Sequence, residues 1–137
     1  FTSDIGPIDI VLDDGGHTYD QQIVTTEMLL TNIKDGGLLV IEDTHTSYLT
    51  GFGPRKFSFI KYTKNMIDKI NNRFSRFKEK KSEKRVWSLR FFESIVALSV
   101  NKNAASMISE PTTNCGKDIQ AWLTTPVNAS MYCTVRL

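Results

Sequence analysis

A chain of 137 residues can bury the core of one domain, but it is short for a complete α/β enzyme. Its formal net charge of +2 and its 40% hydrophobic residues are typical of an ordinary globular protein. The sequence contains no apolar run of about eighteen residues, so no membrane span is predicted. The two cysteines, Cys115 and Cys133, lack metal-binding spacing. We interpret them as thiols of a cytoplasmic protein, with a disulfide as the open alternative.

The first predicted strand covers residues 8–12, where apolar residues are nearly continuous. Such a run is typical of a strand that is buried on both faces. The run stops at Asp13 and Asp14, and two glycines after them predict a tight turn. His17 follows directly after this turn.

An amphipathic helix is predicted over residues 19–34. A capping box of Thr18 and Gln21 marks its start, and its apolar positions recur at helical spacing (Ile23, Leu30 and Ile33). Residues 35–37 would end this helix and lead into a second strand at residues 37–41. A strand, a helix and a strand in this order predict a βαβ unit with parallel strands.

The middle of the chain is predicted to hold a loop and a basic helix. Residues 44–56 contain two glycines and a proline and are interpreted as a loop over the strand ends. From Phe57 to Phe77, apolar residues recur at helical steps between lysines and arginines. Residues 78–85 have no apolar member and predict a solvated, mobile connection. No nucleic-acid motif accompanies the basic residues, so we expect no nucleic-acid partner.

The last predicted elements are a hairpin and a tail. Residues 86–92 and 94–100 are rich in strand-forming residues and predict an antiparallel hairpin at the far end of the sheet. Beyond it, only a helical turn (119–123) and a strand (131–137) are predicted. We therefore expect an α/β unit over residues 1–102 and a tail of unknown role over residues 103–137.

Acidic side chains follow both predicted parallel strands: Asp13 and Asp14 close the first, Glu42 and Asp43 the second. The carboxyl ends of neighbouring parallel strands lie at one edge of a sheet, about 4.8 Å apart. Carboxylates gathered there repel one another unless a cation compensates, and a hard divalent ion such as Mg²⁺ prefers oxygen ligands. The alternative is that one or two of these acids only cap the helices that follow.

Two histidines accompany these acids. His17 is a candidate general base, because an imidazole exchanges its proton near neutral pH. The alternative is a surface histidine at the start of a helix. His45 is a weaker candidate in the same region, as a ligand or as a contact to the substrate.

These motifs resemble a known family. The stretches are Ile-Asp-Ile-Val-Leu-Asp-Asp-Gly-Gly-His (8–17), Lys-Asp-Gly-Gly-Leu-Leu-Val-Ile-Glu-Asp-Thr-His-Thr-Ser-Tyr (34–48) and Gly-Phe-Gly (51–53). They are similar to the C-terminal half of class I S-adenosylmethionine-dependent methyltransferases, and more narrowly to the metal-dependent sugar O-methyltransferases of macrolide and related pathways. That family has a serine where Gly16 stands and a tyrosine where Leu39 stands. The resemblance covers residues 1 to about 102.

The resemblance implies a role for each candidate residue. It implies metal ligands (Asp14, Glu42 and Asp43), a catalytic base (His17), a contact near the methionine end of the cofactor (Asp13) and substrate-loop contacts (Tyr48, to which we add His45). The implied cofactors are S-adenosylmethionine and Mg²⁺, and the implied partner is a small molecule that carries a hydroxyl group.

The family holds its cofactor mainly with the first half of the domain, through a glycine-rich loop and an acid that this sequence lacks. We therefore expect a partial Rossmann-like methyltransferase sheet without its N-terminal half, with strands four to seven of the parent order 3-2-1-4-5-7-6. Residues 8–12 would then form an exposed edge strand, whose unpaired backbone groups can pair with another chain. We expect a homodimer through this strand, or its coverage by the tail.

For the complete parent, the resemblance implies Mg²⁺- and S-adenosylmethionine-dependent O-methyl transfer to a hydroxyl of a sugar or another polyol. The 137-residue chain alone is expected to be inactive. Two alternatives stay open: a protein of the same fold that resembles cephalosporin hydroxylases, and a non-enzymatic interaction domain that has lost the chemistry.

Overall fold

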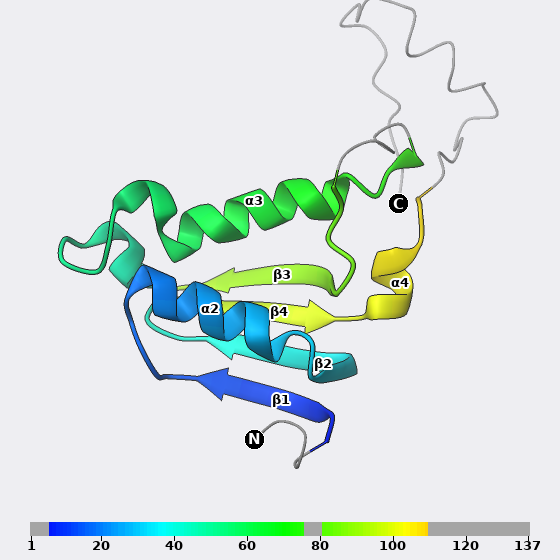
Figure 1. Ribbon diagram of the computed structural model, residues 1–137, viewed down its shortest axis with the longest axis horizontal. Coiled ribbons are helices and arrows are strands. Elements are labelled where there is room, and N and C mark those ends of the chain that lie inside the picture. Colours follow the sequence, from blue (N-terminus) through cyan, green and yellow to red (C-terminus); the bar gives the residue numbers. More distant parts are fainter. Residues whose placement is uncertain (1–5, 76–80, 110–137) are drawn as a thin grey trace, which may run out of the picture.

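The computed structural model describes residues 6–75 and 81–109, and Figure 1 shows their arrangement. Cys115, Cys133, Phe77 and both elements predicted beyond residue 110 lie outside the described residues. Within the described part, no helix combines the length and the hydropathy that a membrane crossing needs.

A four-stranded mixed sheet in the order β1-β2-β4-β3 forms the centre of the fold (Figure 1). β1 (Ile8–Asp13) and β2 (Ile33–Ile41) are parallel, whereas β4 (Ile95–Val100) is antiparallel both to β2 and to β3 (Val86–Phe92). This topology confirms the predicted βαβ unit and terminal hairpin. It is also the order 4-5-7-6 that the resemblance implies.

Two helices cover one face of this sheet. α2 (Tyr19–Leu29) connects β1 to β2, and α3 (Phe59–Asn71) precedes the hairpin. Among the described residues, the core between helices and sheet contains these buried side chains: Leu30, Ile33, Leu39, Ile41, Phe59, Met66, Val86, Val96, Leu98 and Val100. The predicted loop contains two 3-10 helices, η1 (Thr44–Tyr48) and η2 (Arg55–Phe57).

α2 begins as predicted and ends five residues early. Its capping box is formed by Thr18 and Gln21, but the helix stops at Leu29, where Thr31 Oγ1 and Asn32 Nδ2 both donate to the carbonyl of Met28. The predicted helix over residues 19–34 is therefore wrong at its C-terminus. These side chains satisfy a carbonyl that a continuing helix would have used.

Residues 33–37 belong to β2, although they were predicted to end a helix and to form a turn. Ile33 pairs with Ile8 at the start of β1, and its side chain is buried in the core. Gly37 allows the strands to approach, since a Cβ atom there would lie 2.7 Å from the carbonyl of Asp9. Gly36 and Gly37 therefore lie where the pairing between β1 and β2 shifts register, and they do not form a turn.

The prediction that the first strand is buried on both faces is wrong. β1 is an edge strand, and the side chains of Ile10 and Leu12 are 67% and 61% exposed. Both residues lie on the face opposite α2 and α3, which no helix of the described residues covers.

α3 is also shorter than its apolar pattern predicts. Phe59 and Met66 are buried, but Ile67 is 39% exposed and the helix ends at Asn71. Phe74 follows the helix and forms an isolated parallel bridge with Ser109.

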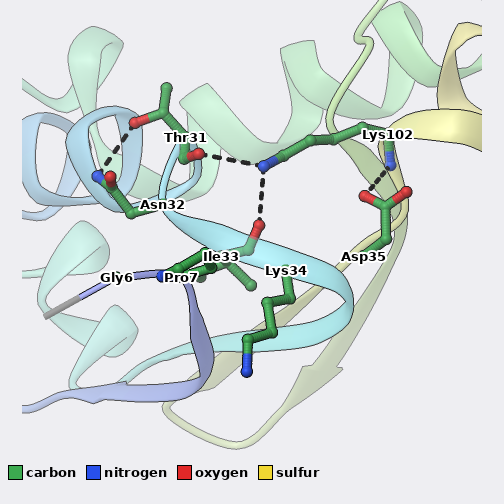
Figure 2. Close-up of a pocket in the computed structure, with 8 residues that line it drawn as sticks. All are labelled: Gly6, Pro7, Thr31, Asn32, Ile33, Lys34, Asp35 and Lys102. Carbon is green, nitrogen blue, oxygen red and sulfur yellow. Dashed lines mark hydrogen bonds between the residues drawn. The ribbon is translucent and has the colours of Figure 1, made fainter. Parts of the chain in front are cut away.

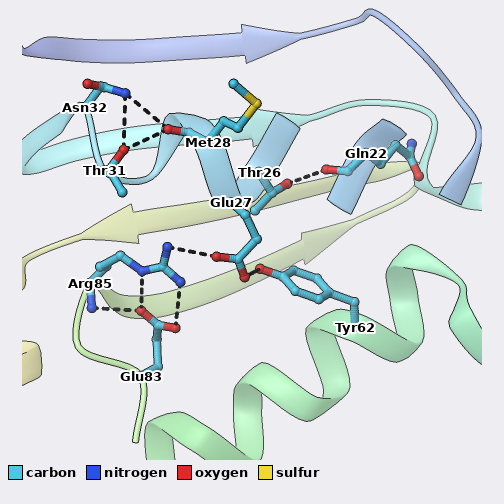
Figure 3. Close-up of polar contacts among 9 residues, drawn as sticks. All are labelled: Gln22, Thr26, Glu27, Met28, Thr31, Asn32, Tyr62, Glu83 and Arg85. Atoms are coloured by element: carbon cyan, nitrogen blue, oxygen red, sulfur yellow. Dashed lines mark hydrogen bonds and ion pairs between the residues drawn. The ribbon is translucent and has the colours of Figure 1, made fainter. Parts of the chain in front are cut away.

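The segment that joins α3 to β3 ends in a buried polar network, not in a solvated connection (Figure 3). Glu83 is only 5% exposed and pairs with Arg85 at 2.9 Å. Arg85 also pairs with Glu27 of α2 at 2.9 Å, and the hydroxyl of Tyr62 in α3 donates to Glu27 at 2.6 Å. The prediction for residues 78–85 is therefore wrong at its C-terminal end, because Glu83 and Arg85 compensate each other and Arg85 also pairs with Glu27 of α2.

Burial and hydrogen bonds oppose each other in this network. Burial raises the pKa of Glu83, but hydrogen bonds from Arg85 outweigh it, so that the pKa falls below its ordinary value of 4.5. The pKa of Glu27 is lowered in the same way by Tyr62 and Arg85 against its own burial. Burial and the bond to Glu27 raise the pKa of Tyr62 well above its ordinary value.

A short helix, α4 (Lys102–Ser106), is tied to the start of β2 (Figure 2). Lys102 Nζ donates to the carbonyls of Thr31 and Ile33 at 3.1 and 2.8 Å, and its backbone N–H donates to Asp35 at 2.8 Å. These residues line an open pocket of about 540 Å³. This pocket lies at the opposite end of the parallel strands from the acids that end them.

Candidate metal centre

The two acidic strand ends lie side by side, as the sequence predicts. Asp13 pairs with Ile41 in the parallel register, and the N–H of Glu42 donates to the carbonyl of Asp13 at 3.0 Å. Asp14 and Asp43 therefore leave the sheet at neighbouring points of one edge.

Asp14, His17 and Asp43 form a group of potential metal ligands. One ligand atom from each lies within 4.8 Å of the others, and no other group of three such side chains in the described part of the chain meets this distance. His17 Nδ1 lies 3.4 Å from Asp43 Oδ2, and the two side chains are 38% and 41% exposed. A site of two carboxylates and an imidazole that is open to solvent fits a divalent cation that keeps part of its water shell.

The other two acids lie differently. Asp13 accepts a hydrogen bond from the N–H of Gly15 through its Oδ1 atom at 3.2 Å, so it stabilises the turn. Glu42 is half-buried and is not a member of the ligand group. Its carbonyl accepts from Gln22 Nε2 at 3.0 Å, while Gln22 Oε1 is buried with no hydrogen-bond partner among the described residues.

Asp43 has an unusual backbone. Its φ of 52° lies in the left-handed region, which a non-glycine residue rarely adopts, although Asp and Asn do so more readily than most. The carbonyl of Asp43 accepts two hydrogen bonds from Thr46, from its N–H at 3.1 Å and from its Oγ1 at 2.8 Å. The sequence did not single out Thr46, because a lone threonine in a loop carries no such signal.

His45 contacts the hairpin turn and lies beside Asp43, although it is not itself a member of the ligand group. Its Nδ1 lies 2.6 Å from Ser94 Oγ and 3.8 Å from Asp43 Oδ1. Since both partners face the same ring nitrogen, these three residues do not have the geometry of a nucleophilic triad, in which the acid and the hydroxyl use different nitrogens. Ser94 was not predicted, because only the folded hairpin brings it to the site.

The loop after β2 is anchored to α2. The hydroxyl of Tyr19 donates to the carbonyls of Thr46 and Leu49 at 3.1 and 2.9 Å, and its ring packs against Gly53. Tyr48 is 61% exposed beside this anchored segment, where it is available to a bound molecule.

No protein-family model matches the sequence, but curated proteins are similar to part of it. The chain is 32% identical over 73 residues to L-olivosyl-oleandolide 3-O-methyltransferase of Streptomyces antibioticus, which covers 48% of this chain and 19% of that protein. It is 46% identical over 48 residues to demethylmacrocin O-methyltransferase of Streptomyces fradiae, which covers 35% of this chain and 12% of that protein. The chain thus spans less than a fifth of these relatives.

Solved structures show the same fold. The MycE methyltransferase from the mycinamycin biosynthetic pathway, in complex with Mg and SAH, matches with a TM-score of 0.68 at 23% identity, over 89% of this chain and 33% of that chain. The complex of MycE with Mg, SAH and mycinamycin VI matches with a TM-score of 0.64 at 25% identity, over 79% of this chain and 29% of that chain.

These matches agree with the α/β fold and with the family that the motifs at the strand ends resemble. The chain has part of the α/β fold of S-adenosylmethionine-dependent methyltransferases and is similar to the macrolide sugar O-methyltransferases.

Proposed function

We propose that this chain carries the metal and catalytic part of a Mg²⁺- and S-adenosylmethionine-dependent O-methyltransferase that acts on a sugar hydroxyl. The observation that carries the proposal is the group formed by Asp14, His17 and Asp43 at the strand ends. The names of the relatives, which methylate glycosylated natural products, support the substrate class.

The proposed metal ligands are Asp14, Glu42 and Asp43. Asp14 and Asp43 already lie in one group, and we propose that the half-buried side chain of Glu42 turns toward the same cation. When bound, Mg²⁺ supplies a positive charge that orients the acceptor hydroxyl and favours its deprotonation.

His17 is the proposed general base. If the nitrogen near Asp43 carries the ring proton, the carboxylate holds the imidazole in the tautomer that leaves Nε2 free to accept a proton. S-adenosylmethionine would supply the methyl group on a sulfonium leaving group, and His17 Nε2 would accept the proton of the acceptor hydroxyl.

Three further residues complete the proposed site. Asp13 is the proposed contact near the methionine end of the cofactor, on the strand end next to the metal ligands. His45 and Tyr48 are the proposed substrate contacts, and both side chains are more than half exposed on η1.

The 137-residue chain alone is proposed to be inactive and to bind S-adenosylmethionine weakly. The chain covers a third of the MycE chain, and we propose that residues corresponding to the other two thirds are needed to hold the cofactor. We also propose that the chain self-associates through the edge of β1, and that it is cytoplasmic.

Metal titration tests the proposed function directly. Mn²⁺, followed by electron paramagnetic resonance, is expected to bind the chain, and Asp14→Asn is expected to weaken that binding strongly. Calorimetry with S-adenosylmethionine is expected to give little heat. Absence of Mn²⁺ binding would favour a non-enzymatic interaction domain, and tight cofactor binding would contradict the proposed inactivity of the chain alone.

A further inference from the structure

We propose that Thr46 is the positioning residue of the metal centre: its hydroxyl joins the segment that bears Asp43 to the segment that bears His17. This inference rests on the proposed function, because it concerns the same group of side chains.

Two carbonyl groups from different strand ends converge on one buried hydroxyl. Thr46 is 3% exposed, and its Oγ1 lies 2.8 Å from the carbonyl oxygen of Asp43 and 3.2 Å from that of His17. A hydroxyl has one hydrogen, so Thr46 donates to these two acceptors in a shared bond or in turn. In either case, separation of the two chain segments breaks a hydrogen bond of this buried hydroxyl.

Thr46 is itself held on both sides. Its N–H donates to the carbonyl of Asp43 at 3.1 Å, and its own carbonyl accepts from the hydroxyl of Tyr19 at 3.1 Å. Tyr19 is buried and is the first residue of α2, two positions after His17. The contacts therefore close a ring that runs from His17 through Tyr19 and Thr46 to Asp43.

The backbone conformation of Asp43 gives this ring a role. A φ of 52° is a left-handed conformation that persists in a non-glycine residue when the surroundings hold it. The two donors of Thr46 act on the carbonyl of this residue. Loss of the hydroxyl removes one of the two donors, so the backbone of Asp43 is held less firmly and its carboxylate is expected to shift relative to Asp14 and His17.

The test compares four forms of the 137-residue chain. Thr46→Val removes the hydroxyl at nearly constant volume, and Thr46→Ser restores it. Thr63→Val is the matched control, because Thr63 is also fully buried and its hydroxyl also donates to a backbone carbonyl, that of Ile60 at 2.9 Å, but within α3. Mn²⁺ affinity is measured by electron paramagnetic resonance, and folding stability by urea unfolding.

Thr46→Val is expected to weaken Mn²⁺ binding about tenfold, as the loss of a residue that orients metal ligands typically does. Thr46→Ser is expected to return the affinity close to that of the wild type, and Thr63→Val to leave it unchanged even where it lowers stability. A Thr46→Val chain with wild-type affinity would overturn the proposal.

A second measurement needs no metal. In amide NMR spectra of the metal-free chain, Thr46→Val is expected to shift or broaden the signals of both His17 and Asp43, and Thr63→Val neither. Unchanged signals would overturn the proposal that the Thr46 hydroxyl joins the two segments. If the wild-type chain binds no Mn²⁺, the proposed metal function fails, while these spectra still decide whether Thr46 joins the two segments.

Discussion

His17 Nδ1 lies 3.4 Å from Asp43 Oδ2, so the proposed base and a proposed metal ligand are direct neighbours. Each comes from a different strand end, and the parallel pairing of β1 and β2 brings them together. Asp43 therefore has two tasks in the proposed mechanism: one carboxylate contributes to the metal charge balance and also orients the imidazole. Changes at Asp43 are expected to affect both.

The first prediction concerns the metal ligands. Asp43→Asn is expected to weaken Mn²⁺ binding at least about tenfold, because a neutral amide replaces a charged oxygen ligand. Asparagine tolerates the left-handed backbone of this position, so the fold is expected to persist. Paramagnetic resonance titration measures the affinity.

Asp9→Asn is the matched control for this prediction, since Asp9 is an exposed acid of β1 that pairs with Lys34 and not with the ligand group. Its Mn²⁺ affinity is expected to equal that of the wild type. Glu42→Gln is expected to weaken binding if Glu42 turns toward the cation as proposed. An unchanged affinity in this variant would remove Glu42 from the ligand set.

The second prediction concerns the loop that carries η1. A Cβ atom on Gly53 would lie 2.7 Å from Cδ2 of Tyr19, and the φ of Gly53 is +141°. Gly53→Ala is expected to displace Tyr19 and with it the hydrogen bonds to Thr46 and Leu49, and so to lower both stability and Mn²⁺ affinity.

Gly51→Ala separates backbone strain from the steric clash. Gly51 also has a positive φ, of +91°, but a Cβ atom there would meet nothing within 4 Å. This variant is expected to lose some stability and to keep its Mn²⁺ affinity. Equal losses of affinity in the two variants would speak against the role of the contact between Gly53 and Tyr19.

The strand ends and the hairpin could be predicted from the sequence because they depend on local pattern and on simple sheet geometry. Acids that follow two parallel strands must meet at one edge. The end of α2 could not be predicted in this way: Leu30 and Ile33 are both buried, but Leu30 follows the helix and Ile33 begins a strand. The spacing of apolar residues indicates which side chains are buried, but it does not show whether a buried residue belongs to a helix or to the strand that follows.

Tertiary contacts account for what the sequence did not predict. Glu83 and Arg85 belong to a charged run, which usually lies in solvent, and only the folded chain brings Glu27 of α2 to them. The contact between His45 and Ser94 likewise depends on the docking of the hairpin turn. The exposure of β1 was predicted from the family order of strands, whereas its composition alone predicted burial on both faces.

The third prediction concerns the buried network. Arg85→Met is expected to lower the free energy of unfolding by about 2 kcal/mol or more, because Glu83 is buried and loses its compensating charge. Lys34→Met breaks the exposed pair with Asp9 and is expected to cost less than about 1 kcal/mol. Urea unfolding of both variants measures the difference, and equal losses would contradict the importance of burial.

The fourth prediction is the pH dependence of stability. Folding lowers the pKa of Glu83 and of Glu27, so the unfolded chain binds protons more readily than the folded chain. Their contribution to stability is therefore fully present above the ordinary value of 4.5 and is lost as the pH falls through the lowered pKa. Glu83→Gln is expected to lose stability at pH 7 and to show a weaker further loss down to about pH 3. An acid-induced loss as steep as that of the wild type would contradict this assignment.

The fifth prediction concerns the edge of the sheet. β1 has an unpaired edge among the described strands, and Ile10 and Leu12 are exposed beside it, so pairing of two copies would satisfy backbone groups and cover apolar side chains. The chain is expected to scatter light as a dimer, and Ile10→Lys to shift it toward the monomer, because two lysines would meet near the shared edge. Val24→Lys places the same change on an exposed residue of α2 and is expected to leave the dimer intact. A wild-type chain that stays monomeric at high concentration would rule out pairing through β1, and equal dissociation by both variants would place the contact elsewhere.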